Sequence, residues 1–316
     1  ILGTGGSSLG GKTLISLADK KNKKNNTHIY FIENIDQDSI TEIINSVNLN
    51  KTGILVISKS GETLETLSQY FYIKEFLIKK KVDFQRRIFV LTENKKSTLK
   101  KIQEENNFFF INHDKKIGGR YSIFSSVGLI PANLYGLKIK NLCDGGMNFI
   151  KQLSLNDFEK FDYLFLPTFY KYSLLQKNIN INIFMPYMDK MQNFSYWLRQ
   201  LWAESVGKNG KGSTLVNALG TVDQHSQLQL YLDGPKDKFF TIMYKKDLEK
   251  KSDILQCEIG VEKIFSTLQN KSMKKLMAAE VFATIETIKR KKLPLTTISL
   301  NKINEETIGS LLMYFF

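Results

Sequence analysis

The chain has 316 residues, of which 42% are hydrophobic and 24% are charged. This composition is typical of a folded globular protein with one large core or two ordinary ones, and it excludes a disordered chain. The net charge of +14 would suit a polyanion-binding protein, but the basic residues are spread along the chain, and their densest run, 20–24, falls where a loop is expected. We therefore expect a solvated basic surface and no nucleic-acid partner.

The two cysteines, Cys143 and Cys257, have no metal-ligand spacing and form no paired framework. Such usage suits a reducing compartment. No segment approaches the ~20 apolar residues of a membrane span, and none is typical of a signal peptide. We expect a cytoplasmic protein with no membrane partner. Because the chain begins like the end of a strand and stops inside an apolar helical pattern, we also expect an N-terminal lead-in and a C-terminal part to be missing.

Short apolar runs rich in β-branched and aromatic residues alternate with longer helical patterns. This alternation predicts an α/β fold of two units, each a mainly parallel sheet flanked by helices in three layers. The predicted domains are 1–140 and 141–316, with the crossing near 137–144. The predicted strands are 28–33, 53–57, 87–92, 108–111, 181–186, 238–244 and 295–299, and the predicted long helices are 63–80, 192–205 and 272–291.

The most informative motif is Ser-Lys-Ser-Gly-Glu-Thr at 58–63, the 58–63 turn, which joins a predicted strand to a predicted helix. A helix N-terminus has unpaired N–H groups and a partial positive charge. With the hydroxyls of Ser58, Ser60 and Thr63 and the ammonium of Lys59, the turn suits a phosphate monoester. The alternative is an ordinary capped helix, since Ser and Thr are preferred N-caps.

A glycine-rich turn, Gly-Thr-Gly-Gly-Ser-Ser-Leu-Gly at 3–10, follows the first strand-like residues. Glycines let the backbone approach a ligand closely, and Ser7 adds a hydroxyl beside Gly6. The spacing departs from the dinucleotide fingerprint G-x-G-x-x-G. Paired with the 58–63 turn, it would form half of one crevice at a switch point of the sheet.

A third turn, Gly-Gly-Arg-Tyr-Ser at 118–122, enters a predicted helix. Arg120 supplies a rigid, permanently charged fork that suits a phosphate or a developing oxyanion. A structural Arg is the alternative, but the helix dipole disfavours a cation at a helix start. We therefore favour a functional role.

Two later motifs carry candidates for proton transfer. Gln200 and Glu204 are four residues apart, hence on one helical face, and Glu204 falls in a last turn, where the helix dipole disfavours an acid. Glu204 is a candidate general base, with an ordinary surface carboxylate as the alternative. His225 lies in a polar turn that enters a helix, and acid–base work suits it better than metal binding, because no second His or Cys stands at ligand spacing.

In this order, the five motifs resemble the glucose-6-phosphate isomerase family, which is built from two sugar-isomerase (SIS) domains, and the resemblance covers the whole chain. It implies reversible isomerisation of glucose 6-phosphate and fructose 6-phosphate in glycolysis and gluconeogenesis, through a cis-enediol(ate). It implies no metal and no organic cofactor. Two alternatives stay open: a dual phosphoglucose/phosphomannose isomerase, and a non-catalytic sugar-phosphate-binding regulator.

The resemblance also implies residue roles. Glu204 would transfer the proton between C1 and C2, with Gln200 contacting the sugar, and Arg120 would stabilise the intermediate. His225 would assist ring opening from the neighbouring subunit of a homodimer. The phosphate would be held by Gly6, Ser7, Ser58, Lys59, Ser60 and Thr63.

The chain departs from the family pattern at two places. Glu62 stands where the family often has Thr, and an anion beside a phosphate is unfavourable, so we expect its side chain to face away from the ligand. The family also uses a lysine in a C-terminal helix for ring opening, and this sequence ends before such a segment. We expect little activity on cyclic glucose 6-phosphate from the 316 residues alone.

Overall fold

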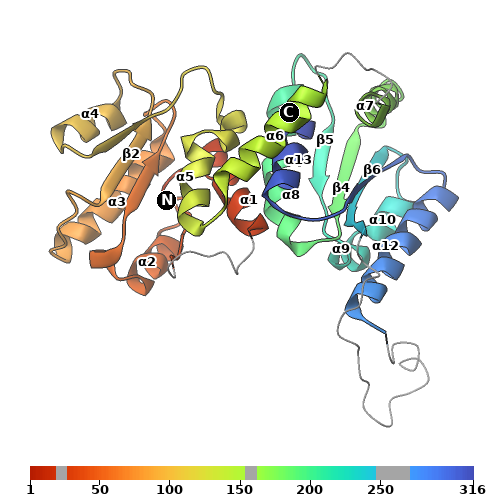
Figure 1. Ribbon diagram of the computed structural model, residues 1–316, viewed down its shortest axis with the longest axis horizontal. Coiled ribbons are helices and arrows are strands. Elements are labelled where there is room, and N and C mark those ends of the chain that lie inside the picture. The colour runs from red at the N-terminus through yellow and green to blue at the C-terminus, as the bar shows by residue number, and fades with distance from the viewer. Residues whose placement is uncertain (19–26, 154–161, 247–270) are drawn as a thin grey trace, which may run out of the picture. The chain divides into compact units, whose positions relative to one another are not determined.

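The computed structural model describes residues 1–18, 27–153, 162–246 and 271–316 (Figure 1). The basic run 20–24 and Cys257 lie outside these ranges. The chain divides into two compact units, Ile1–Asp144 together with Phe316, and Gly145–Phe315, which we call unit 1 and unit 2. Their boundary falls inside one helix, α6 (Ile139–Leu153). The domain limits 1–140 and 141–316 stay a prediction.

Unit 1 is built on a parallel sheet in the order β1-β2-β3. The predicted strand at 28–33 is reduced to one bridge: Leu2 pairs in parallel with Ile32 on one side and with Val56 of β1 on the other. The full lateral order is therefore Ile32, Leu2, β1, β2, β3. The strands are β1 (Ile54–Ile57), β2 (Ile88–Thr92) and β3 (Phe109–Asn112).

Both faces of this sheet are covered by helices. Ile54 and Val56 belong to a core with residues of α2, α3 and α4. Leu55 and Ile57, which alternate with them, belong to a second core with residues of α5, and α1 packs beside α5. The helices are α1 (Leu9–Leu17), α2 (Gln37–Ser46), α3 (Leu64–Lys79), α4 (Thr98–Glu105) and α5 (Ser126–Tyr135), with 3-10 turns η1 (Gly5–Ser7), η3 (Leu49–Lys51) and η4 (Gly119–Phe124).

Unit 2 contains a second parallel sheet in the order β5-β4-β6-β7. Strand β5 was not predicted, because its sequence Thr-Leu-Val-Asn has only two apolar residues and it lies at the sheet edge, where fewer side chains are buried. The strands are β4 (Ile181–Pro186), β5 (Thr214–Asn217), β6 (Lys238–Lys245) and β7 (Leu295–Leu300).

The second sheet is also enclosed on both faces. Ile183 and Ile242 pack with residues of α10 and α12. Phe184 points the other way and its ring contacts Phe194 of α8 and Phe315 of α13. The helices are α7 (Asp162–Leu175), α8 (Gln192–Val206), α9 (Val222–Ser226), α10 (Leu228–Asp233), α12 (Met273–Arg290) and α13 (Glu305–Phe315), with the 3-10 turn η6 (Asp189–Met191).

The predicted α/β fold, with parallel sheets between helical layers, is confirmed in both units. Apart from 28–33, the predicted strands appear within a residue or two at each end, and so do the three long helices. Among the described helices, none has the length and apolar content needed to cross a bilayer.

Replacing Ile242 with Ala tests the core of unit 2. The side chain is fully buried in β6, so its truncation should lower the free energy of unfolding by about 2–5 kcal/mol. Its register partner Thr297 on β7 is exposed, and Thr297→Ala should cost less than about 1 kcal/mol. Urea denaturation of both variants makes the comparison, and equal losses would contradict the burial assigned to Ile242.

Candidate functional site

Three turns with predicted site residues lie at one edge of the unit 1 sheet. The glycine turn follows Leu2, the 58–63 turn follows β1, and 118–122 follows β3. Because parallel strands all end at the same edge, these turns share the carboxyl edge. After Leu2, the chain next enters the sheet at Ile32, on one side of Leu2, and then crosses to β1 on the other side of Leu2. The strand order therefore reverses between Leu2 and β1. The first two turns therefore flank a topological switch point, as predicted.

The glycine turn is packed against the 118–122 turn. A Cβ added to Gly6 would lie 2.4 Å from the carbonyl carbon and oxygen of Gly119, so the two backbones touch. The hydroxyl of Ser122 joins them by donating to the carbonyl of Gly6 at 2.9 Å and to that of Gly119 at 2.7 Å. Gly6 and Ser7 are thereby held next to Arg120. Of the glycines in this motif, Gly6 has the steric requirement that most directly shapes the site.

The hydroxyls of the 58–63 turn hold the turn itself together. Ser58 is buried, and its Oγ lies 2.8 Å from Thr63 Oγ1 and accepts from the amide of Gly61 at 3.1 Å. Ser60 is exposed and its Oγ accepts from the amide of Glu62 at 3.1 Å. Gly61 has φ of 73°, the left-handed region that favours glycine. The turn is therefore a preformed loop at the start of α3.

The N-terminus of α3 differs from those of α4 and α5. Thr63 is the N-cap residue, yet its side chain makes no capping bond to α3. By contrast, Ser97 caps α4 by accepting from Lys100 N, and Ser125 caps α5 by accepting from Val127 N. The capped-helix interpretation of the 58–63 turn is therefore wrong for Thr63. The first amides of α3 are left without the side-chain oxygen that Ser and Thr usually supply.

Lys59 is half-buried, and its ammonium is directed along the carboxyl edge. It donates to the carbonyl of Lys115 at 3.1 Å and lies 3.6 Å from the carboxylate of Glu93. A hydrogen bond from Lys95, at 2.7 Å, is the main reason that the pKa of Glu93 falls below its usual range, and Lys59 adds to the effect. Lys59 therefore brings positive charge to the same edge as the hydroxyls.

Arg120 lies in the 3-10 helix η4, where the start of an α-helix was predicted. The α-helix, α5, begins at Ser126. The guanidinium stacks on the ring of Tyr121, with 4.6 Å between Cζ and the ring centroid. This contact fixes the planar fork at the edge of the sheet.

In unit 2, α8 carries the candidate base. The amide nitrogen of Gln200 donates to Oε1 of Glu204 at 2.9 Å, so the two side chains share one face of the helix, as predicted. Glu204 is exposed. The amide oxygen of Gln200 is buried, and no hydrogen-bond donor within the described ranges reaches it. An acceptor left in this state is unfavourable unless another donor, such as a ligand hydroxyl, satisfies it.

His225 is exposed on the short helix α9, which its neighbours hold firmly. Asp223 accepts from the amide of Leu219 and from Ser226 Oγ, both at 2.6 Å. Burial would raise the pKa of Asp223, but these hydrogen bonds outweigh it and leave the pKa below its usual value. On the other side, Gln224 donates to the buried hydroxyl of Tyr187 at 2.8 Å. The imidazole is thus displayed outward from a braced helix.

Glu204 and His225 lie at opposite edges of the unit 2 sheet. Strands β4 and β5 are parallel, so α8 must carry the chain from the carboxyl edge back to the amino edge before β5 begins. Trp202, two residues before Glu204, donates to the carbonyl of Ser213 at the start of β5. His225 follows the far end of β5, where Gly220 N donates to the last residue of β4. With a rise of about 3.3 Å per residue, the six residues of β4 separate the edges by about 20 Å.

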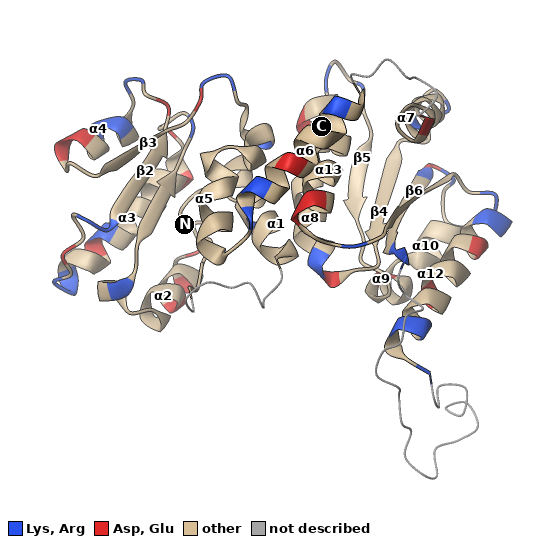
Figure 2. Ribbon diagram, viewed as in Figure 1, with Lys and Arg blue, Asp and Glu red and all other residues tan. Residues whose placement is uncertain are grey.

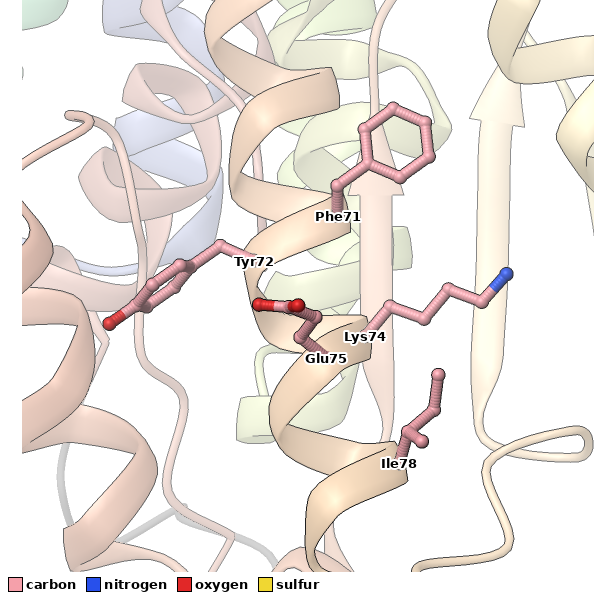
Figure 3. A pocket seen from close by; sticks show the side chains of 5 residues that line it. All are labelled: Phe71, Tyr72, Lys74, Glu75 and Ile78. Atoms are coloured by element: carbon pink, nitrogen blue, oxygen red, sulfur yellow. The ribbon is translucent and has the colours of Figure 1, made fainter.

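Two other features of the described surface are not part of this arrangement. A hollow on α3 is lined by Phe71, Tyr72, Lys74, Glu75 and Ile78 (Figure 3). It begins about two helical turns beyond Thr63 and is largely apolar. Basic residues are distributed over helices and loops of both units, with acidic residues among them (Figure 2). No group of three His, Cys, Asp or Glu side chains that could hold a metal occurs in the described residues.

Comparison with known proteins identifies the family. The family model for phosphoglucose isomerase matches residues 1–315. The chain belongs to the phosphoglucose isomerase family. A glucose-6-phosphate isomerase of Methanocaldococcus jannaschii is 34% identical over 315 residues, which cover 100% of this chain and 75% of the relative. A probable glucose-6-phosphate isomerase of Methanococcus maripaludis is 33% identical over 321 residues, which cover 100% of this chain and 70% of the relative.

Two solved structures share the fold of this chain. A hypothetical protein of Thermus thermophilus superposes with a TM-score of 0.86 at 26% identity, covering 99% of this chain and 74% of that one. A glucose-6-phosphate isomerase of Chlamydia trachomatis gives 0.75 at 20% identity, covering 99% and 62%. At that identity the second match supports the fold alone.

Sequence reasoning missed residues that support the turns of the candidate site. Glu33 accepts from the buried Ser8 at 2.6 Å and pairs with Lys12, and so fixes the start of α1 behind the glycine turn. The amide and the hydroxyl of Thr98 both donate to the carboxylate of Glu62. Ser122 belongs to one of the predicted motifs. Its hydrogen bond to Gly6, 116 residues earlier in the chain, could not be predicted from the sequence.

The contact between Gly6 and Gly119 can be tested by adding one methyl group on either side of it. Gly6→Ala would place Cβ against backbone, and should lower the free energy of unfolding by about 1–3 kcal/mol. Gly119→Ala is the matched control, because its added Cβ would meet nothing within 4 Å, and it should change stability by no more than about 0.5 kcal/mol. Denaturant unfolding measures both, and a Gly119→Ala loss as large as that of Gly6→Ala would refute the asymmetry.

Proposed function

We propose that this chain interconverts glucose 6-phosphate and fructose 6-phosphate through a cis-enediol(ate), as a glycolytic and gluconeogenic isomerase of the cytoplasm. Membership of the phosphoglucose isomerase family supports the aldose–ketose isomerase class. The structural observation that carries the proposal is the start of α3, where amides without a side-chain cap follow a turn rich in hydroxyls. Such a helix start binds an anion well.

The proposed phosphate-binding residues belong to unit 1. Gly6, Ser7 and the 58–63 turn, through Ser58, Lys59, Ser60 and Thr63, would hold the phosphate. This group is remote from the reacting carbons, so its binding provides free energy that orients the sugar. Arg120 stacks on Tyr121 at the same carboxyl edge and would stabilise the negative charge that develops on the enediolate oxygens.

The proposed proton-transfer residues belong to unit 2. Glu204 would remove the proton from one carbon and return it to the other, since a carboxylate can act both as base and as acid. Gln200, which already donates to Glu204, keeps its buried carbonyl oxygen available to a sugar hydroxyl. This pairing orients the carboxylate and supports Glu204 over an ordinary surface acid.

His225 would assist opening of the sugar ring in the active site of a second subunit. The separation of about 20 Å between the two edges of the unit 2 sheet places it beyond the reach of Glu204 in its own chain. Its exposure on the braced helix α9 suits donation to a neighbour. A homodimer in which each copy supplies His225 to the other accounts for both observations.

Glu204→Gln tests the proton-transfer role. Gln retains the shape but cannot take a proton, so kcat should fall by about 10²–10⁴-fold while fructose 6-phosphate still binds in calorimetry. The control is Glu286→Gln, which removes an exposed carboxylate from α12 and should leave kcat unchanged. Both are measured in the complete protein, and retained isomerisation by Glu204→Gln would exclude this carboxylate as the base.

A hybrid dimer tests the assignment of His225. One subunit carries Glu204→Gln and the other His225→Ala, with different affinity tags so that only the hybrid is purified. If His225 acts across subunits, one site of the hybrid contains both native residues, and activity on glucose 6-phosphate should return to about half of the wild-type value. If both residues act within one chain, each site lacks one of them, and the hybrid would be no more active than the parent variants.

A further inference from the structure

Glu62 has the wrong charge for a phosphate-binding turn, yet its carboxylate has a defined partner. The amide of Thr98 donates to Oε1 at 2.6 Å and the hydroxyl of Thr98 donates to Oε2 at 2.7 Å. These bonds, the hydroxyl first, hold the pKa of Glu62 below its usual value. The side chain is therefore an anion held at the first residue of α4.

The 58–63 turn and the start of α4 form one hydrogen-bonded unit. Besides the Thr98 amide, the next amide, that of Leu99, donates to the carbonyl of Gly61 at 3.0 Å, and that of Lys100 donates to Ser97 Oγ at 3.3 Å. The first three amides of α4 are thus all satisfied. A Cβ on Gly61 would lie 2.2 Å from Ser97 Oγ, which shows how closely the turn approaches the helix.

The neighbouring helix has the opposite character, because Thr63 makes no side-chain cap on α3. Both helices start at the carboxyl edge of the same sheet. Each N-terminus would favour an anion. At α4 that position is filled by the protein's own carboxylate, whereas at α3 the N-cap side chain of Thr63 leaves it open.

We propose that Glu62 is a positioning residue for phosphate binding: its carboxylate fastens the 58–63 turn to the start of α4 and leaves the start of α3 as the anion site. The inference rests on the proposed function. Without the two bonds to Thr98, the bond from the Leu99 amide to Gly61 would remain to join the turn to α4. Ser60 and Thr63 would then be held less firmly, and ordering the turn would oppose binding of the phosphate.

A simple electrostatic interpretation gives the opposite result. If Glu62 acted only as a negative charge near the phosphate, its neutralisation would remove repulsion and tighten binding. The direction of the change in affinity therefore separates the two explanations.

The test measures fructose 6-phosphate kinetics and competitive inhibition by inorganic phosphate in the complete protein. For Glu62→Ala, which removes both carboxylate oxygens, we expect KM and the phosphate Ki to rise about tenfold with kcat within about twofold of wild type, because the phosphate contacts contribute to ground-state and transition-state binding alike. Glu65→Ala is the charge-matched control, since Glu65 is an exposed acid in the first turn of α3, and its Ki should change by less than about twofold.

Thr98→Ala removes the hydroxyl bond from the α4 side and should raise Ki in the same direction. The double variant should bind phosphate no more weakly than Glu62→Ala alone, since both changes break one connection. An unchanged or lowered Ki in Glu62→Ala, or fully additive effects in the double variant, would overturn the inference. Its failure is distinguishable from that of the proposed function, because a wild-type protein without isomerase activity would refute the function itself.

Discussion

The structure depends on one constraint: parallel strands release the chain at a single edge of the sheet. In unit 1 this constraint brings together turns that are far apart in sequence, around residues 6, 60 and 120. The backbone contact between Gly6 and Gly119 and the bridging hydroxyl of Ser122 then fix the spacing of two of these turns. Hydroxyls, an ammonium and a guanidinium accumulate at the edge because the topology delivers them there.

Helix capping separates the helix starts at that edge, because the N-cap side chains leave α1 and α3 uncapped and cap α4 and α5. The side chains of Ser97 and Ser125 cap α4 and α5, and Glu62 adds a carboxylate to α4. Thr63 instead bonds to Ser58, and α3 receives no such oxygen. Serine and threonine thus serve opposite purposes within one unit, and residue type alone does not distinguish them. The distinction lies in whether the hydroxyl turns toward its own helix or toward the preceding loop.

This distinction also explains how much could be predicted from the sequence. Apolar periodicity located nearly all strands and long helices, because buried strands such as β1 and β2 have continuous apolar runs. It missed β5 and overestimated the strand at 28–33, since both lie at sheet margins where tertiary pairing outweighs pattern. Motif order identified the candidate residues, but the partner of Glu62 is 36 residues away, and no local signal points to it. Side-chain partners across the sheet edge need the fold.

The same constraint acts differently on unit 2. There α8 runs back from the carboxyl edge, so a carboxylate near its end, Glu204, is delivered to the amino edge, while His225 follows β5 at the opposite edge. One parallel sheet cannot bring a residue at the end of a return helix next to one that follows the next strand. If a single reaction uses both side chains, the histidine has to come from another copy of the chain. Oligomerisation would then be a consequence of strand direction, and an exposed histidine on a braced helix is what such an arrangement requires of each copy.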